Sequence, residues 1–196
     1  VLQMGFAMGV LLANISSSPF IVQQHYGFSA FEFSLFFGIN ALAIGLAAGL
    51  SVKFKKPEHA TILGSVGMTM MSAVEFVILS NEYHFAVYEA VLFVLLFSMG
   101  LTFTASTTLA MDCERANSGT ASALFGAAGF AFGGIVSPLV GLGDILSTTG
   151  LIFFVCSVCS LCFSVLAMNQ THTNLWGSFK CKMGPVTRFV FLRREK

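Results

Sequence analysis

Long apolar runs dominate the chain, and short polar segments interrupt them at regular intervals. A helix that crosses the hydrocarbon core of a membrane needs about 20 mostly apolar residues. Six runs meet that length, at residues 1–20, 31–52, 60–79, 86–110, 120–141 and 148–168. A β-barrel would need alternating segments of about ten residues, and these runs do not alternate. We therefore predict an all-α membrane protein with six transmembrane helices.

The composition agrees with a chain embedded in a membrane. Only 10% of the 196 residues are charged, whereas a soluble domain carries about 25%. Hydrophobic residues make up 56% of the chain, and its mean hydropathy is +0.83. So little polar sequence cannot cover a globule in water, which excludes a soluble globular domain. The net charge of +1 gives no indication of nucleic-acid binding.

The distribution of basic residues predicts the orientation of the helices. All ten fall after the second, fourth and sixth apolar runs, and the other three connections contain none. They are Lys53, Lys55, Lys56, Arg115, Lys180, Lys182, Arg188, Arg193, Arg194 and Lys196. Because successive connections alternate sides, all these cations share one face, which the positive-inside rule assigns to the cytoplasm. We expect both chain ends to be cytoplasmic, with a basic tail at 169–196 after a six-helix bundle at 1–168.

Two segments 88 residues apart resemble each other. Ser34–Gly45 and Ser122–Gly133 share five identities in twelve positions. The pairs are Ser34/Ser122, Phe37/Phe125, Gly38/Gly126, Ala43/Ala131 and Gly45/Gly133. Two units of three helices have opposite topologies, and such inverted repeats occur in many secondary transporters. We predict two inverted three-helix repeats; chance matching of Gly- and Ala-rich helices is the alternative.

Small residues line one face of the second predicted helix and one face of the fifth. Helices in lipid approach closely where their contact residues are small. We expect the glycines of these faces to be helix-packing positions, and smooth faces of this kind would also allow sliding. The positions are Gly38, Gly45, Gly49, Gly126, Gly129 and Gly133.

Polar side chains within the apolar runs are candidates for a transport pathway, because polar groups are costly to bury in a membrane. The candidates share a face of the first predicted helix (Gln3, Asn14 and Ser17), lie on the second (Asn40), or share a face of the fourth (Glu89, Thr104 and Thr107). Glu89 is the strongest because it is ionisable, and our hypothesis is that it binds a proton or a cationic substrate. The alternative is a hydrated carboxylate near the outer interface, which is the favoured interpretation for Glu75.

Motifs for metals, cofactors and catalysis are absent from the sequence. Cys156, Cys159 and Cys162 have a spacing that resembles iron–sulfur ligation, but they lie within an apolar run, where packing is the better interpretation. The four histidines lie in connections or the tail and lack ligand spacing. No nucleotide-binding or nucleophile motif appears. We expect no cofactor, no metal and no enzymatic activity.

Four segments carry a family resemblance in their order and spacing. They are Ser16–Gln23 (SSSPFIVQ), Phe33–Ala41 (FSLFFGINA), Ser106–Asp112 (STTLAMD) and Ala116–Gly141. They resemble the C-terminal six-helix half of Bcr/CflA multidrug efflux transporters, which belong to the major facilitator superfamily. The resemblance covers nearly all of residues 1–168.

This resemblance implies a twelve-helix transporter of a bacterial inner membrane that exports drugs in exchange for protons by alternating access. The partner of this chain would be a missing N-terminal six-helix half, and a start at Val1 within an apolar run also leads us to expect upstream sequence. The first and fourth helices would line the cavity, and the second and fifth would pack at the interface between halves. Lys53 and Phe54 stand where a Gly-x-x-x-Asp-Arg loop of the family has Asp and Arg. Proton coupling is therefore implied by the family alone.

Two other classes of protein stay open at this point. One is a self-contained six-helix membrane protein, such as a channel or an oligomeric adaptor, without drug transport. The other is a membrane enzyme, which would need clustered ionisable residues near a helix end. Only Asp112 and Glu114 come close to such a cluster. The sequence selects no particular substrate.

Overall fold

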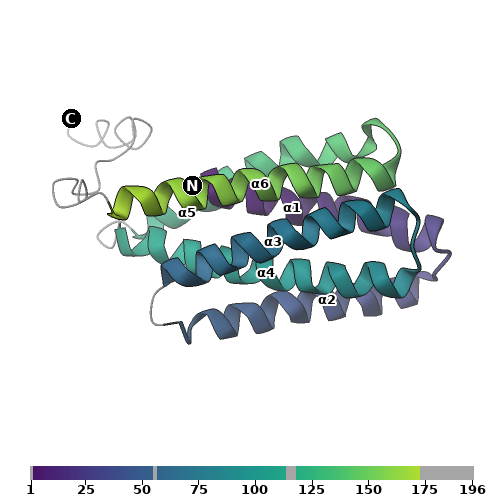
Figure 1. Cartoon of the computed structure of the whole chain (residues 1–196), viewed down its shortest axis with the longest axis horizontal. Coiled ribbons are helices and arrows are strands. Elements are labelled where there is room, and N and C mark those ends of the chain that lie inside the picture. Colours follow the sequence, from purple (N-terminus) through teal and green to yellow (C-terminus); the bar gives the residue numbers. More distant parts are fainter. Residues whose placement is uncertain (1, 55–56, 114–117, 173–196) are drawn as a thin grey trace.

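A computed structural model describes residues 2–54, 57–113 and 118–172, and it shows a bundle of long helices (Figure 1). Six helices in these ranges are long and apolar enough to cross a membrane, which confirms the predicted fold class. They are α1 (Leu2–Pro19) with its π-helical continuation η1 (Phe20–His25), α2 (Ala30–Ser51), α3 (Pro57–Ser80), α4 (Phe85–Cys113), α5 (Ser118–Val136) with its 3-10 continuation η3 (Ser137–Leu142), and α6 (Ile145–His172). The predicted basic tail lies almost entirely outside the described residues.

Local signals in the sequence set the helix boundaries. Ser29 caps α2 in a capping box, in which its hydroxyl accepts from the Glu32 amide and its own amide donates to the Glu32 carboxylate at 2.9 Å. Gly27, at φ +75°, makes the turn before this cap. Pro57 opens α3, where its missing N–H costs nothing. Asp144 accepts from the Ser147 amide at 3.0 Å and caps α6, and these bonds lower the pKa of the Asp144 carboxyl.

Four helices form a closed ring, and the other two flank it. Around the ring α4 packs on α3, α3 on α6 and α6 on α1, while a smaller contact between α1 and α4 closes it. α2 packs on the outside of α4, and α5 packs on the outside of α1. α4 and the span formed by α1 and η1 are therefore the most enclosed, with 56% of the most apolar window buried in each, against 17% in α2. Figure 1 shows α2 along one edge of the bundle.

The ring has the symmetry that the predicted repeat requires. Exchanging α1 with α4, α2 with α5 and α3 with α6 converts the α1–α6 contact into α4–α3 and the α1–α5 contact into α4–α2. The α3–α6 and α1–α4 contacts map onto themselves. Each unit contains three helices, so the packing supports two inverted triplets, as in half of a major-facilitator fold.

The residue pairs that suggested the repeat do not occupy equivalent environments. Phe37 is 40% exposed, whereas Phe125 is 6% exposed. Gly45 faces open space, whereas Gly133 packs against Leu12 of α1. Equivalent burial appears instead at an offset of 89 residues, which pairs buried positions of α2 with buried positions of α5 and its continuation η3. These pairs are Asn40/Gly129, Ala47/Val136 and Ser51/Val140. The helices repeat, but the matched identities are out of register by one residue.

Small residues bring α3 against α4. A Cβ atom built on Gly64 would lie 2.7 Å from the Ser98 carbonyl oxygen and 2.8 Å from the Thr102 amide nitrogen. One on Gly67 would lie 2.7 Å from the Ser98 hydroxyl. The two backbones are therefore nearly in contact, which is how helices gain dispersion energy in lipid.

Hydroxyl pairs join α3 to α6 on the neighbouring side. Ser65 and Ser164 share a hydrogen bond of 2.9 Å, and Ser72 pairs with Ser157 two turns beyond it. Thr69 also donates to the Ser157 carbonyl oxygen at 3.1 Å. All four serines are buried. Such bonds satisfy polar groups that lipid cannot solvate.

The glycines predicted as packing positions divide into two groups. Gly129 packs against Met8 and Gly133 against Leu12, so both contact α1. The other four have no atom within 4 Å of an added Cβ among the described residues. These are Gly38, Gly45, Gly49 and Gly126. The exposed face of α2 therefore packs against no other helix among the described residues.

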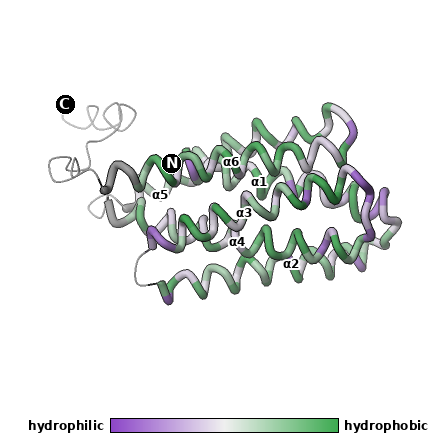
Figure 2. Tube along the Cα trace, in the orientation of Figure 1, coloured by the Kyte–Doolittle hydropathy of each residue, from purple (hydrophilic) through white to green (hydrophobic). Residues whose placement is uncertain are grey.

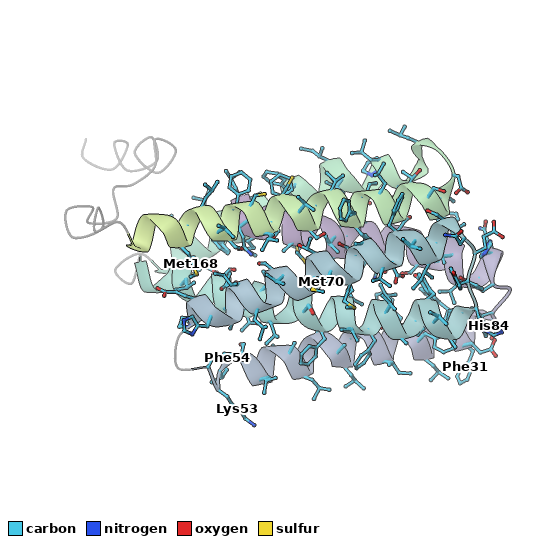
Figure 3. All side chains as sticks on the ribbon, viewed as in Figure 1. Phe31, Lys53, Phe54, Met70, His84 and Met168 are labelled. Atoms are coloured by element: carbon cyan, nitrogen blue, oxygen red, sulfur yellow. The ribbon has the colours of Figure 1, made fainter. Side chains whose placement is uncertain are left out.

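Polar residues gather at the two ends of the bundle, and apolar residues fill the lengths of the helices (Figure 2). Lys53 lies at one end, and His84 and Phe31 lie at the other (Figure 3). Two of the connections at the His84 end carry acidic residues, Glu82 and Asp144. We call this end the acidic end. Its assignment to the outer side of the membrane stays a prediction.

The close contact at Gly64 gives a direct test of this packing. Gly64→Ala should lower the free energy of unfolding by about 1–3 kcal/mol, because the added methyl collides with backbone atoms of α4. Gly45→Ala is the matched control and should change stability little, because its Cβ meets open space. Reversible unfolding in mixed micelles measures both values. Equal effects of the two variants would contradict the arrangement of α3 on α4.

Candidate functional site

Glu75 is the most deeply buried ionisable residue of the described ranges. It lies on α3, five residues before the helix ends at the acidic end, and it has no exposed surface. Neither carboxylate oxygen has a hydrogen-bond partner among the described residues. The expectation that Glu75 is a hydrated surface carboxylate is therefore wrong.

The burial of Glu75 follows from the helical face on which it lies. Ser65, Met68 and Ser72 precede it on α3 at intervals of three or four residues, and all are completely buried. Residues at these intervals share one side of a helix. The sequence therefore contained the signal for the burial of Glu75, in the small and hydroxyl-bearing residues of its own stripe.

Tyr88 and Glu89 on α4 lie beside Glu75. The Glu75 carboxylate interacts electrostatically with Glu89 and with the phenol of Tyr88. Tyr88 has no exposed surface, and its hydroxyl interacts with the side chain of Ser18 on α1. Two carboxyl groups and a phenol are thus brought together from neighbouring helices.

Asn40 of α2 completes this group of residues. Its side-chain Nδ2 donates to Oε1 of Glu89 at 2.9 Å. Asn40 is buried and Glu89 is half-buried. The remaining oxygen of each, Asn40 Oδ1 and Glu89 Oε2, has no partner in the described structure. We call Asn40, Glu75, Tyr88 and Glu89 the carboxyl cluster.

Aromatic rings lie on the acidic-end side of the carboxyl cluster. Phe85, one turn before Glu89 on α4, is their centre: its ring lies 4.3 Å from Phe28, 4.7 Å from Phe36 and 5.2 Å from Tyr26 between ring centroids. The Tyr26 hydroxyl donates to the Tyr83 carbonyl oxygen at 2.9 Å. We call Tyr26, Phe28, Phe36 and Phe85 the aromatic cap.

The predicted candidates on α1 fall into separate surroundings. The Ser18 hydroxyl donates to Asn14 Oδ1 at 3.0 Å, and Ser17 donates to the Asn14 carbonyl oxygen at 3.4 Å. All three are buried near the acidic end of α1. Gln3 lies more than two turns away at the other end, where its amide faces Ser160 of α6 at 3.4 Å. The shared helical angle that grouped these residues did not place them together along the axis.

The two threonine candidates on α4 are distant from the carboxyl cluster along the helix. Thr104 and Thr107 are both half-buried. The Thr107 hydroxyl donates to the Phe103 carbonyl oxygen at 2.8 Å, four residues back on its own helix. Of the seven predicted pathway residues, the structure joins Asn40 to Glu89 by a direct bond. A role of all seven in transport stays a prediction.

The three cysteines of α6 point in different directions. Cys156 is buried, with its sulfur facing Gly9 of α1, while Cys159 is partly buried and Cys162 is exposed. Within the residues that the structure describes, no group of three or more His, Cys, Asp or Glu is placed to hold a metal ion. The packing interpretation of Cys156 agrees with its contact.

Comparison with known proteins adds one similarity. A protein of Bacillus subtilis (strain 168), described as an uncharacterized MFS-type transporter, YdgK, is 34% identical to this chain over 178 residues. The aligned region covers 88% of this chain and 44% of that protein, so this chain spans less than half the length of its relative. No family model matches the chain, and no solved structure matches it.

The bond between Asn40 and Glu89 is expected to stabilise the contact of α2 with α4. In a double-mutant cycle of Asn40→Ala and Glu89→Ala, we expect a coupling energy of about 1 kcal/mol, the usual size for a hydrogen bond between membrane helices. Unfolding in mixed micelles measures the four stabilities. Glu32→Ala paired with Asn40→Ala is the control pair and should show no coupling, because Glu32 bonds to Ser29. Strict additivity of the first pair would contradict the contact.

Tyr26 gives a prediction for alkaline pH. Burial, with smaller effects of Glu75 and Glu82, raises the pKa of the Tyr26 phenol above its ordinary value of 10.0. The folded chain then keeps this proton at pH values where the unfolded chain has lost it, so the free energy of unfolding should fall as pH rises beyond 10.0. The difference in phenolate absorbance between the wild type and Tyr26→Phe isolates this group. A Tyr26 component that titrates at or below the ordinary value would contradict the prediction.

Proposed function

We propose that this chain is the C-terminal six-helix half of a transporter that exports drugs or other small amphipathic molecules in exchange for protons. The observation that carries the proposal is the similarity over 178 residues to a protein described as an uncharacterized MFS-type transporter. The aligned region covers 44% of that protein. The helix contacts relate α1–α3 to α4–α6 as two three-helix units. Two such units are the arrangement expected of half of a transporter of this kind. A transport protein of this kind performs no covalent chemistry on its substrate.

The exposed face of α2 supports a second half. Gly38, Gly45 and Gly49 lie in one stripe, and none meets an atom of the described chain within 4 Å of an added Cβ. A glycine face exposed to lipid makes no close helix contact, whereas another helix can pack closely against it. In this proposal the stripe, together with Gly126 of α5, contacts the N-terminal half and lets the two halves rock against each other.

Alternating access then assigns a role to the inner helices. α1 and α4, which are neighbours in the ring, line one wall of a cavity between the halves. Asn14, Ser17, Thr104 and Thr107 are the polar groups proposed for this wall, and Gln3, Asn40 and Glu89 are the further pathway candidates. Such a cavity binds amphipathic molecules through apolar walls with a few polar groups. The membrane is a bacterial inner membrane in this proposal, and the Lys53 end faces the cytoplasm.

A self-contained six-helix protein is the second candidate function. The same exposed stripe on α2 favours it, because two copies of the chain could pair through their glycine faces. This alternative predicts a channel or an oligomeric adaptor that acts without another half.

A transport assay separates the two functions. In liposomes, the 196-residue chain alone should show no efflux of ethidium or chloramphenicol, because it offers one wall of a two-walled cavity. A twelve-helix transporter that contains it should show efflux driven by a pH gradient. Gly45→Leu should lower this efflux at least tenfold by separating the halves, and Val66→Leu on the exposed face of α3 is the control that should not. Efflux by the chain alone, or full activity of Gly45→Leu, would overturn the proposal.

A further inference from the structure

We propose that Glu75 binds a proton within the bundle, and that Asn40, Tyr88 and Glu89 form the rest of its site. The link to transport rests on the proposed function, but the binding site itself does not. The sequence favoured Glu89 as the ionisable residue of interest; the geometry points instead to Glu75, with Glu89 as its neighbour.

The first step of the argument is the set of unpaired oxygen atoms. Four buried oxygens of the carboxyl cluster have no hydrogen-bond partner among the described residues: both of Glu75, and one each of Asn40 and Glu89. Buried polar groups are almost always hydrogen-bonded. Such a concentration of acceptors on α2, α3 and α4 indicates that the site holds a positively charged species.

The second step is the absence of a cationic side chain around the cluster. α1 presents Asn14, Ser17 and Ser18 near this end, α2 presents Asn40, and α6 places Gly150 against Phe76, the residue after Glu75. The loops add Tyr26 and Glu82. Tyr26 interacts electrostatically with both Glu82 and Glu75. Among these described neighbours there is no Lys or Arg.

The position of the basic residues along the chain extends this point. Every Lys and Arg of the sequence lies at 53–56, at 115 or at 180–196. Lys53 lies at the end of the bundle opposite His84 (Figure 3). Glu75 lies five residues before α3 ends at Ser80, and Glu89 lies four residues after α4 begins at Phe85, so both are near the His84 end. Two carboxylates close together within a membrane repel each other, and no Lys or Arg among the described residues around them offsets this repulsion. Their neutralisation requires a ligand.

The third step identifies the ligand as a proton. The Asn40 amide donates to Glu89, so Glu89 already has one donor, whereas Glu75 has none. A proton on Glu75 removes the charge that is most costly to bury, and it supplies a donor for the unpaired oxygen of Glu89. Zinc and other transition-metal ions are held by several His, Cys or carboxylate ligands, and no group of three or more such residues occurs within the described ranges.

The aromatic cap gives the site a route to the acidic end in this proposal. Tyr26, Phe28, Phe36 and Phe85 pack around one another on the loop side of Glu89. Exchange of the proton with the acidic end therefore requires these rings to separate. Release of the proton leaves Glu75 and Glu89 both negative, which disfavours the packed arrangement of α3 and α4. Proton occupancy is thereby linked to the conformation of the bundle.

Carbodiimide labelling tests the site directly, because dicyclohexylcarbodiimide reacts with protonated carboxyl groups in apolar surroundings. The full 196-residue chain is reconstituted in liposomes, labelled at neutral pH and mapped by mass spectrometry. Glu75 should carry the adduct, and raising the pH should reduce its labelling at least tenfold. Glu32→Gln, which removes an exposed carboxylate, is the control that should leave labelling of Glu75 unchanged.

Each outcome of this experiment decides the proposal. Absence of an adduct at Glu75, or labelling confined to exposed carboxylates, would overturn it. Protection by sodium ions at constant pH, compared with choline, would also overturn it, because the site would then bind sodium and not a proton. If Glu75→Gln fails to fold, Tyr88→Phe provides the second variant and should change the pH dependence of labelling at Glu75.

Transport measurements separate this proposal from the proposed function. Labelling of Glu75 without any efflux by the twelve-helix transporter would leave the proton site in place and remove the transport function. Proton-driven efflux without labelling of Glu75 would remove the site and leave the function. Efflux that becomes independent of the pH gradient in Glu75→Gln, but not in Glu32→Gln, would support both.

Discussion

The close approach of α3 to its two neighbours is the interaction on which the rest of this structure depends. Lipid provides no hydrophobic drive for helix association, so contact must come from dispersion and interhelical hydrogen bonds. Gly64 and Gly67 bring α3 against the backbone of α4, and Ser65 and Ser72 bond to α6 on the adjacent side. With contacts on two sides, α3 has one allowed rotation about its axis. That rotation turns Glu75 into the bundle.

Much of the architecture could be predicted because lipid imposes simple rules on a sequence. Length and apolarity identified the six helices, and the confinement of basic residues to alternate connections agreed with that number. Individual polar positions such as Asn40 and Glu89 were also visible, because they interrupt apolar runs. Their mutual hydrogen bond was not, since it depends on how far α2 is displaced along α4. No local pattern encodes that displacement.

Other predictions were less exact for equally physical reasons. Identities in the sequence aligned the repeat at an offset of 88 residues, whereas burial aligns α2 with α5 at an offset of 89 residues. Glycine occurs on packed faces and on open faces alike, so glycine identities did not fix the register. Gln3 was grouped with Asn14 by helical angle, although eleven residues at about 1.5 Å each separate them by about 16 Å. Glu75 was misjudged because proximity to a helix end was weighed above the buried stripe that it continues.

The exposed glycine stripe and the carboxyl cluster meet on one helix. α2 is the least buried of the six spans, and its main contact is with α4. Through that contact Asn40 donates to Glu89, while Gly100 of α4 fits against Ala47. A partner that packs on Gly45 and shifts α2 must therefore alter the hydrogen bond that Asn40 donates to Glu89. Loss of that donor makes the charge of Glu89 costlier beside Glu75. Movement at the open face and occupancy of the buried site are thus mechanically connected through Asn40.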